Sequence, residues 1–331
     1  MSKSAASRLM KSRWTPWLVL AAALCLPLLA NLVEFPYLTR VGGVVGLFML
    51  LALGLNFTLG YVGLFDLGFI AFYAIGAYTA AIAMKMHVPA PLAILLAVAV
   101  TTAVRLLLGV TILRLRGDYL AVVTMGFGEI ARLTINNLDA LTNGPKGMQV
   151  RSWRPLAFIA KEPNVQYYLL IVAAVALSAA ASRRLEDSRV GRAWVAIRED
   201  EVAARLSGIP VQRYKLLAFV LSAVFAGLAG ALFALWEQFV TPESFVFWES
   251  MLVVSIVVLG GMGSIAGVLL GALILGGLPP LMQAVLMMQE RISTDWINYR
   301  YLLFGLILVL VTLFRPQGLL PSARREAELE S

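Results

Sequence analysis

Five charged residues lie inside otherwise apolar stretches of the chain, where an isolated charge is costly. They are Asp66, Arg105, Asp118, Glu129 and Arg132. A charge within a membrane-spanning helix costs about 2.5–3.5 kcal/mol on insertion scales, so it usually faces the interior of a bundle. Glu129 and Arg132 are three residues apart and can pair on one helix face, where we expect a structural pair between helices in preference to a ligand site. Arg105 lies deep enough in its stretch to need a partner.

Residues for enzymatic chemistry are sparse. The sequence has one His, His87, and one Cys, Cys25, so no His/Cys cluster could bind zinc, and it has no His-Glu-x-x-His motif. The segment Gly144-Pro145-Lys146-Gly147 lacks the glycine spacing and the Lys-Ser/Thr pair of a nucleotide-binding P-loop. We therefore expect a protein that is not an enzyme, has no cofactor or metal, and does not hydrolyse ATP itself.

The composition indicates the kind of element that must position these residues. Of the 331 residues, 60% are hydrophobic and 14% are charged. A soluble domain has about 45–50% apolar and about 25% charged residues, so this composition excludes a water-soluble enzyme, a disordered chain and a disulfide scaffold. Long apolar runs instead predict a helical protein that spans the membrane several times.

The apolar runs divide into about ten segments of roughly the length needed to span a bilayer. They lie near 14–33, 40–59, 66–86, 90–113, 118–137, 166–182, 214–236, 250–262, 265–288 and 300–315. We expect an all-α, polytopic membrane helix bundle that forms a single domain over residues 1–331, with some segments short or broken. The segment 250–262 is too short to cross alone, so it is either a half-helix or an oblique crossing.

The distribution of basic residues orients the segments. A net charge of +8 would suggest a nucleic-acid partner in a soluble protein, but here it follows the positive-inside rule, and we expect no nucleic acid. Residues 1–13 and the loop 183–213 are strongly basic, which places them and the N-terminus in the cytoplasm. Three arginines, Arg315, Arg324 and Arg325, place the C-terminus on the same side. The segment 237–249 carries three Glu and no base, as expected outside. The loop 138–165 is also expected outside, although it contains four basic residues.

Two glycine-rich passages interrupt the apolar pattern with similar spacing. They are Gly60-Tyr61-Val62-Gly63 followed by Gly68, and Gly260-Gly261-Met262-Gly263 followed by Gly267. The shared spacing suggests an internal repeat of the kind found in membrane transport folds. Glycines that break or thin a helix also make backbone groups available to a cavity.

The stretch 191–210 predicts one short helix in the cytoplasmic loop. Its apolar stripe would comprise Val195, Val202 and Leu206, and the charged face beside it Arg198, Glu201 and Arg205. Gly208 and Pro210 would end the helix. Such a helix is suited to be a lever between a membrane domain and a soluble motor, or it is a solvated amphipathic loop helix. The residues alone do not decide between these two interpretations.

The same stretch carries a resemblance to a known family. Glu201-x-Ala203-Ala204-x-x-x-Gly208 looks like the coupling-helix motif of ABC importer permeases, although Val202 stands at the usual position of the Glu and the acid lies one residue earlier. Gly-Arg-Ala followed by Ile-Arg-Glu-Asp-Glu is similar to a narrower group, the Liv-type branched-chain amino acid permeases, and specifically their M-type subunit. Three further passages resemble the same family: Gly60 to Tyr78, Gly117 to Arg132, and Leu141 to Met148. Together the resemblance covers roughly residues 40–320.

The resemblance implies one subunit of a larger machine. Such permeases form half of a membrane heterodimer with an H-type subunit, bind two cytoplasmic ATPases, and receive the amino acid from a periplasmic or surface binding protein. The implied location is the bacterial cytoplasmic (inner) membrane, with the chain crossing the lipid bilayer many times. The residues that would couple the permease to the ATPases are Arg198, Glu199, Asp200, Glu201, Ala203, Ala204 and Gly208.

A translocation path needs residues that open a helix or present polar groups. The candidates are Gly60, Tyr61, Gly63, Gly68, Gly126, Gly128, Glu129 and Arg132. Tight helix packing explains each glycine equally well. Two other functions remain open. Related permeases carry urea, short amides or other small polar solutes, and a stand-alone secondary transporter would need ion-coupling carboxylates deep in the membrane. Asp66 and Glu129 are too few and too near span ends to favour the latter.

Overall fold

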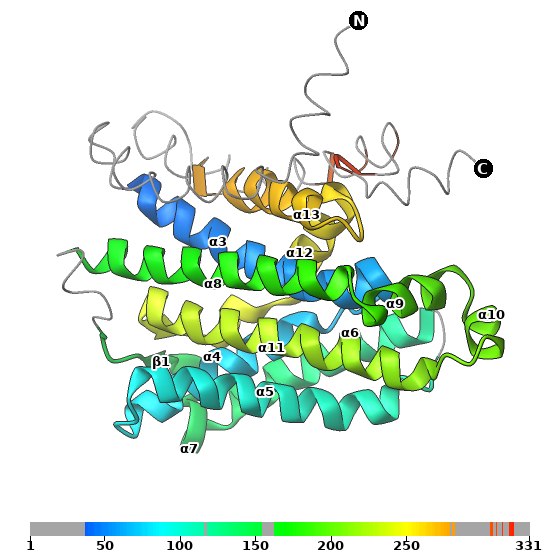
Figure 1. The fold of residues 1–331 in the computed structure, drawn as a ribbon. Coiled ribbons are helices and arrows are strands. Elements are labelled where there is room, and N and C mark those ends of the chain that lie inside the picture. Colours follow the sequence, from blue (N-terminus) through cyan, green and yellow to red (C-terminus); the bar gives the residue numbers. More distant parts are fainter. Residues whose placement is uncertain are drawn as a thin grey trace, which may run out of the picture.

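A computed structural model describes residues 37–115, 118–153, 162–278 and 280–281, together with 305–306, 309, 313 and 318–320. Within these residues the regular structure is helical, apart from one pair of two-residue strands. The predicted span 14–33, most of the predicted span 300–315 and both termini lie outside the described residues. The expected all-α helix bundle is confirmed for the part of the chain described (Figure 1).

The long helices follow the predicted spans closely. They are α3 (Tyr37–Leu55), continued by the π-helix η1 (Asn56–Val62), α4 (Phe69–Lys85), α5 (Ala90–Ile112), α6 (Asp118–Asn137), α8 (Pro163–Glu186) and α11 (Val211–Glu237). Four continuous helices, 37–62, 90–112, 163–186 and 211–237, are long and apolar enough to cross a membrane. Helix α6 has the bounds of the predicted segment 118–137.

The predicted short segment 250–262 forms a helix shorter than a bilayer. Helix α12 (Phe247–Gly260) has 14 residues, about 21 Å at 1.5 Å per residue. The chain then turns back into α13 (Ile265–Gly271) and the π-helix η4 (Ala272–Gly276). The two arms pack closely, since a Cβ placed on Gly260 would lie 2.3 Å from the carbonyl oxygen of Gly267.

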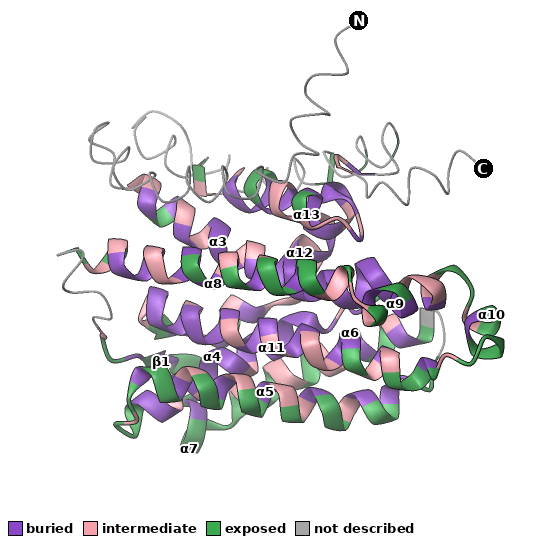
Figure 2. Ribbon diagram, viewed as in Figure 1, coloured by how far each residue is buried: buried purple, intermediate pink, exposed green. Residues whose placement is uncertain are grey.

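Helix α11 lies at the centre of the bundle and packs against α3, α4 and α5. Small residues allow these backbones to approach, as is usual where helices associate within a membrane. A Cβ placed on Gly76 would lie 2.7 Å from the carbonyl oxygen of Gly227, and one on Gly230 would lie 2.3 Å from that of Tyr73. Buried residues follow α3 and α11, whereas α5 turns a largely exposed side outward (Figure 2).

The outer surface of the bundle is apolar. Leu95 and Leu107 on α5 and Tyr119 and Val122 on α6 are each at least 65% exposed. Exposed apolar surface on this scale marks a membrane or protein interface, because a soluble monomer rarely tolerates it. The surface therefore agrees with the predicted membrane bundle.

The connections gather at two opposite ends of the bundle (Figure 1). At one end, β1 (Met148–Gln149) pairs antiparallel with β2 (Phe239–Val240), close to α7 (Asp139–Thr142), η2 (Gly144–Lys146) and η3 (Pro242–Phe245). The described part of the loop 138–165 therefore lies beside the acidic segment 237–249. At the other end lie two short helices, α9 (Arg189–Glu199) and α10 (Glu201–Leu206).

Candidate functional site

The stretch 191–210 folds as two helices, so the prediction of a single helix is wrong. Asp200 has an extended backbone, with φ −152° and ψ 111°, and separates α9 from α10. Its side-chain Oδ1 accepts hydrogen bonds from the backbone N–H groups of Val202 (2.7 Å) and Ala203 (3.0 Å). This is the geometry of a helix N-cap, for which Asp is among the preferred residues. The acid at this position therefore starts a second helix where a continuous periodicity was expected.

The break also overturns the predicted apolar stripe. Val202 is 65% exposed and Leu206 is 84% exposed, whereas Val195 is half-buried on the other helix. The residues that anchor the pair are Trp194 and Ile197 on α9 and Ala204 on α10, all of which are buried. Helix α10 thus projects from the bundle and presents exposed apolar side chains at its surface (Figure 2).

Trp194 fixes α9 to the membrane helices, a role that the sequence interpretation missed. Its side chain is fully buried, and its Nε1 donates to the backbone oxygen of Tyr214 at 2.8 Å. Its ring stacks on Tyr61, with centroids 6.2 Å apart, and meets the edge of Phe57 at 5.7 Å. Tyr61, a candidate path residue, is accordingly buried against α9 in this conformation. The signal in the sequence that could have revealed this anchoring role was a tryptophan within a short amphipathic helix.

The predicted charged face divides into two groups. Glu201 accepts from Arg205 Nη2 at 3.0 Å and from Lys215 Nζ at 2.7 Å, so α10 is joined to the start of α11. Arg198 instead points into the bundle, where its Nη1 donates to the backbone oxygen of Gly60 at 2.6 Å. The break at Asp200 separates the two groups. The expected face comprising Arg198, Glu201 and Arg205 does not exist.

The other residues assigned to coupling lie at the surface of this helix pair. Glu199, Asp200, Ala203 and Gly208 are exposed, and Ala204 is turned inward. Gly208 has φ +82°, and a Cβ placed there would have nothing within 4 Å among the described residues. It therefore provides a left-handed turn after α10, as predicted for a helix end.

The two glycine-rich passages meet in space. Each ends in a left-handed glycine, Gly63 at φ +78° and Gly263 at φ +80°. The side-chain Oδ1 of Asn56, inside the π-helix, accepts from the backbone N–H of Gly263 at 2.9 Å. A Cβ on Gly60 would lie 1.9 Å from that same oxygen and 2.7 Å from the backbone nitrogen of Gly263. The similar spacing in the sequence therefore corresponds to two similar turns packed against each other.

Glycines near α6 fall into two groups. A Cβ on Gly68 would lie 2.0 Å from the carbonyl oxygen of Thr124, and one on Gly128 would lie 3.3 Å from the Cα of Gly68. These two glycines allow the loop before α4 to approach α6. Gly126 is exposed, and a Cβ there would meet nothing within 4 Å in the described part of the chain. Packing within this chain therefore explains Gly68 and Gly128 but not Gly126.

Glu129 and Arg132 pair with each other on α6. Arg132 Nε donates to Glu129 Oε2 at 3.1 Å, and a second hydrogen bond links the same two side chains. The glutamate side chain is 47% exposed and the arginine side chain 26%. The pairing on one helix face is confirmed, but within the described residues the pair does not join two helices as expected.

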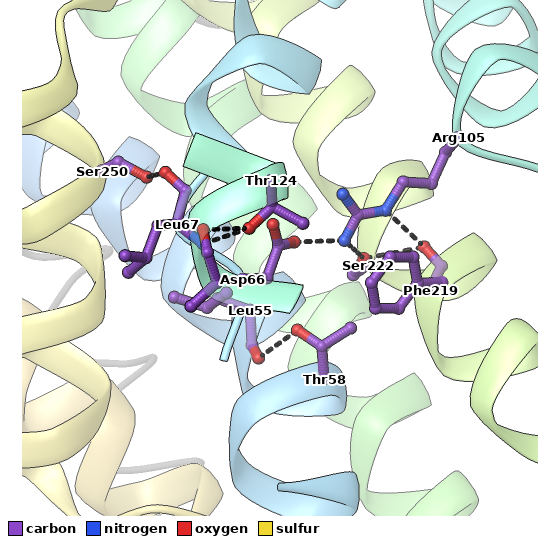
Figure 3. A network of polar contacts seen from close by, with 10 residues as sticks. Leu55, Thr58, Asp66, Leu67, Arg105, Thr124, Phe219, Ser222 and Ser250 are labelled. Atoms are coloured by element: carbon purple, nitrogen blue, oxygen red, sulfur yellow. Dashed lines mark hydrogen bonds and ion pairs between the residues drawn. The ribbon is translucent and has the colours of Figure 1, made fainter. Parts of the chain in front are cut away.

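Arg105 finds its partner in Asp66, which lies on the loop between η1 and α4 (Figure 3). The guanidinium also donates from Nε to the Phe219 backbone oxygen at 3.4 Å and from Nη2 to Ser222 Oγ at 3.3 Å. Its Cζ lies 3.9 Å from the ring centroid of Phe219. A buried charge is tolerated when it is paired and hydrogen-bonded, and the pair therefore ties the loop to α5 and, through Arg105, to α11.

The neighbouring residue, Leu67, is held through its backbone (Figure 3). Its N–H donates to Thr124 Oγ1 on α6 at 3.1 Å, and its carbonyl accepts from Ser250 Oγ on α12 at 2.6 Å. The loop at residues 63–68 therefore contacts α5, α6 and α12 directly, and α11 through Arg105, so it is a point where these four helices are joined.

A bundle with four helices long and apolar enough to cross a membrane fits a multi-spanning membrane protein, and the family match gives its class as a permease. The chain belongs to the family described as branched-chain amino acid transport system / permease component, whose model matches residues 37–312. The match covers every described membrane helix as well as α9 and α10. The resemblance found in the sequence is thus confirmed, and the family is that of the permease component of the transport system, not of its ATPase.

Individual relatives agree with the family. Over 337 aligned residues the chain is 40% identical to LivM of Salmonella typhimurium, a high-affinity branched-chain amino acid transport system permease protein, with 92% of this chain and 76% of that protein covered. LivM of Escherichia coli is 38% identical with the same coverage. A shorter match of 133 residues is 38% identical to LivH of Salmonella typhimurium and covers 40% of each chain. No solved structure matches this chain.

Proposed function

We propose that this chain forms half of the membrane path of an ATP-driven importer for branched-chain or related amino acids. The proposal rests on chain-wide similarity to LivM, a permease protein of a high-affinity branched-chain amino acid transport system. The structural observation that carries it is the α9–α10 pair, which is anchored in the bundle through Trp194 and projects an exposed apolar helix at one end. An exposed helix with an anchored base is what a soluble motor needs in order to move a membrane domain.

The projecting helix is the coupling element in this proposal. Val202 and Leu206 would seat in a groove of an ATPase subunit, because exposed apolar side chains on a short helix gain by burial. The exposed acids Glu199 and Asp200 would fix the register beside them. Two such ATPases would bind the heterodimer, one below each permease. The motif residues Ala203 and Gly208 would allow close approach of the partner surface.

The second half of the path would be an H-type permease. Similarity of this chain to LivH over part of its length supports two subunits with related folds. Helix α6 is the element best placed to line the path between them, since Val122, Gly126 and Glu129 are exposed on it. Selectivity would lie largely in a separate binding protein that delivers the solute, because a zwitterion with an apolar side chain needs little fixed charge in a path that it only transits.

The topology of the proposal places α9, α10 and both termini in the cytoplasm. The arginine-rich segment 183–213 supports this side under the positive-inside rule. The strands β1 and β2 would face the periplasm, where the binding protein docks. Their pairing brings the basic loop 138–165 beside the acidic segment 237–249 and so supports a common side for both. The membrane would be the bacterial cytoplasmic membrane.

The alternative of a stand-alone secondary transporter is disfavoured by the state of Asp66. An ion-coupling carboxylate must be able to bind and release its ion, but Asp66 is fully buried and paired with Arg105. Whether the same fold instead carries urea or short amides is decided by measuring which solute the reconstituted complex accumulates.

Reconstitution tests the proposal directly. The chain would be coexpressed with its H-type permease, ATPases and binding protein, and the complex incorporated into vesicles with ATP on the ATPase side. We expect uptake of radiolabelled leucine, isoleucine or valine that requires ATP, both ATPase subunits and the binding protein. Uptake of leucine by the permease pair alone would contradict an ATP-driven importer, and accumulation of urea in place of leucine would contradict the proposed substrate class.

A further inference from the structure

We infer that Arg198 is an internal latch, through which movement of the coupling helices reaches the two glycine turns in the membrane domain. The inference rests on the proposed function and deepens it, because it assigns Arg198 a positioning role inside the permease. A contact with the ATPase surface, which the sequence motif suggested for this residue, is replaced by a contact with the permease's own membrane helices.

The guanidinium of Arg198 meets the C-terminal end of η1. The last carbonyls of any helix have no intrahelical donor, and they carry the negative end of the helix dipole. Gly60 is within this last turn of η1, and its carbonyl oxygen accepts from Arg198 Nη1 at 2.6 Å. The interaction is a charge-assisted hydrogen bond at a half-buried position, which is stronger than a neutral one.

The same guanidinium lies beside the second glycine turn. Arg198 Nη1 is 3.6 Å from where a Cβ on Gly263 would stand, and Gly263 is itself tied to Asn56 of η1 by the 2.9 Å hydrogen bond. Helix α12 ends at this turn. One side chain from the coupling region therefore contacts the point where the C-terminal ends of η1 and α12 come together.

The steric fit at this point transmits displacement. Gly60 and Gly63 are tightly packed. A Cβ on Gly60 would overlap Asn56, and one on Gly63 would lie 3.1 Å from the Cγ of Arg198. A π-helix is a rare variant of the α-helix that occurs frequently at functional sites. A pull on α9 would thus act on η1 directly.

Arg192 offers a matched control on the same helix. It is an exposed arginine of α9 whose Nη1 makes a local contact, donating to the Asp187 backbone oxygen at 3.0 Å. In the reconstituted complex, Arg198→Gln should lower the amino acid transported per ATP hydrolysed about tenfold, the effect of losing one charge-assisted hydrogen bond. Arg192→Gln should stay within about twofold of wild type. Membrane abundance and assembly with the H-type subunit are measured in parallel for both variants.

A covalent latch provides the decisive measurement. The Cβ of Arg198 lies 3.9 Å from the position of a Cβ on Gly63, within the range that a disulfide bridges. In a Cys25→Ala background, Gly63→Cys combined with Arg198→Cys should be poorly coupled when reduced and should recover coupling when oxidised. Gly63→Cys alone controls for strain at its left-handed backbone and should not respond to oxidation.

Three outcomes would overturn the latch. They are normal coupling in Arg198→Gln, failure of the two cysteines to cross-link in the resting complex, and a cross-linked complex that remains uncoupled. The last outcome would mean that α9 and the turn must separate during transport. Failure of the proposed function is distinguishable, because the wild-type complex would then show no ATP-dependent uptake at all.

Discussion

Asp66 and Arg105 form an almost fully buried ion pair between the loop after η1 and the middle of α5. Their side chains are 0% and 2% exposed, respectively. The guanidinium also lies over the Phe219 ring and donates to backbone and hydroxyl oxygens of α11. The same loop carries Leu67, whose backbone contacts α6 and α12. The ion pair therefore holds the loop in the position in which it joins α5, α6 and α12.

Asp66→Asn should destabilise the protein strongly. Removal of one partner from a buried ion pair leaves the other charge uncompensated, at a cost of about 3–5 kcal/mol. The free energy of unfolding, measured by denaturant titration in detergent micelles, should fall by an amount of this order. Glu129→Gln is the control, because it breaks a partly exposed pair on α6 whose worth is about 0–1 kcal/mol. Equal destabilisation by the two variants would contradict the assigned role of Asp66.

Two glycines of the predicted path should respond differently to the same change. In Gly60→Ala the added methyl would lie 1.9 Å from Asn56 Oδ1, so the turn must rearrange, and we expect loss of stability of about 1–3 kcal/mol as for other overpacked sites. In Gly126→Ala the methyl meets nothing within 4 Å among the described residues, so stability should be unchanged or slightly raised. Thermal unfolding of the purified chain measures both. Loss of transport by the stable Gly126→Ala variant would then support a path or partner contact at α6.

Much of the fold could be predicted because apolar runs are governed by one simple constraint. Backbone groups in a bilayer must be satisfied within the segment, so a sufficiently long apolar run becomes a helix. Helices α5 and α6 accordingly begin and end within a residue of the predicted segments 90–113 and 118–137. The shortness of α12 could also be predicted from the sequence, because the length of a helix follows directly from its number of residues.

The local site was harder to predict because it depends on long-range contacts. Asp200 appears in the sequence as one more charge on a helix face, yet its side chain satisfies the N–H groups of a new helix. Arg198 is drawn away from Glu201 by the end of η1, which lies far away in the sequence. The periodicity of the sequence carries no information on either the N-cap formed by Asp200 or the end of η1 that binds Arg198. The glycine spacing indicated that two turns are alike but not that they touch.

Cysteine accessibility should separate the path from the lipid surface. Val122 on α6 and Leu107 on α5 are 67% and 76% exposed on the isolated chain, so they are matched in exposure but differ in proposed surroundings. In a Cys25→Ala background and within the assembled complex, Val122→Cys should react with a water-soluble maleimide, because a translocation path is hydrated. Leu107→Cys should react at least about tenfold more slowly, because a thiol in the hydrocarbon core is not ionised. Equal reaction rates would count against α6 as the lining helix.

Glu201→Gln should uncouple transport without removing the protein from the membrane. Lys215 is buried and loses its only described anionic partner in this variant, so the joint between α10 and α11 should loosen. We expect transport and substrate-stimulated ATP hydrolysis to fall about tenfold, the effect of one lost charged hydrogen bond. Arg205→Gln breaks only the exposed pair with the same carboxylate, worth about 0.3–0.5 kcal/mol, and should leave both rates near wild type. If the two variants behave alike, the joint with α11 does not transmit the motion, and contacts of the exposed face of α10 must do so instead.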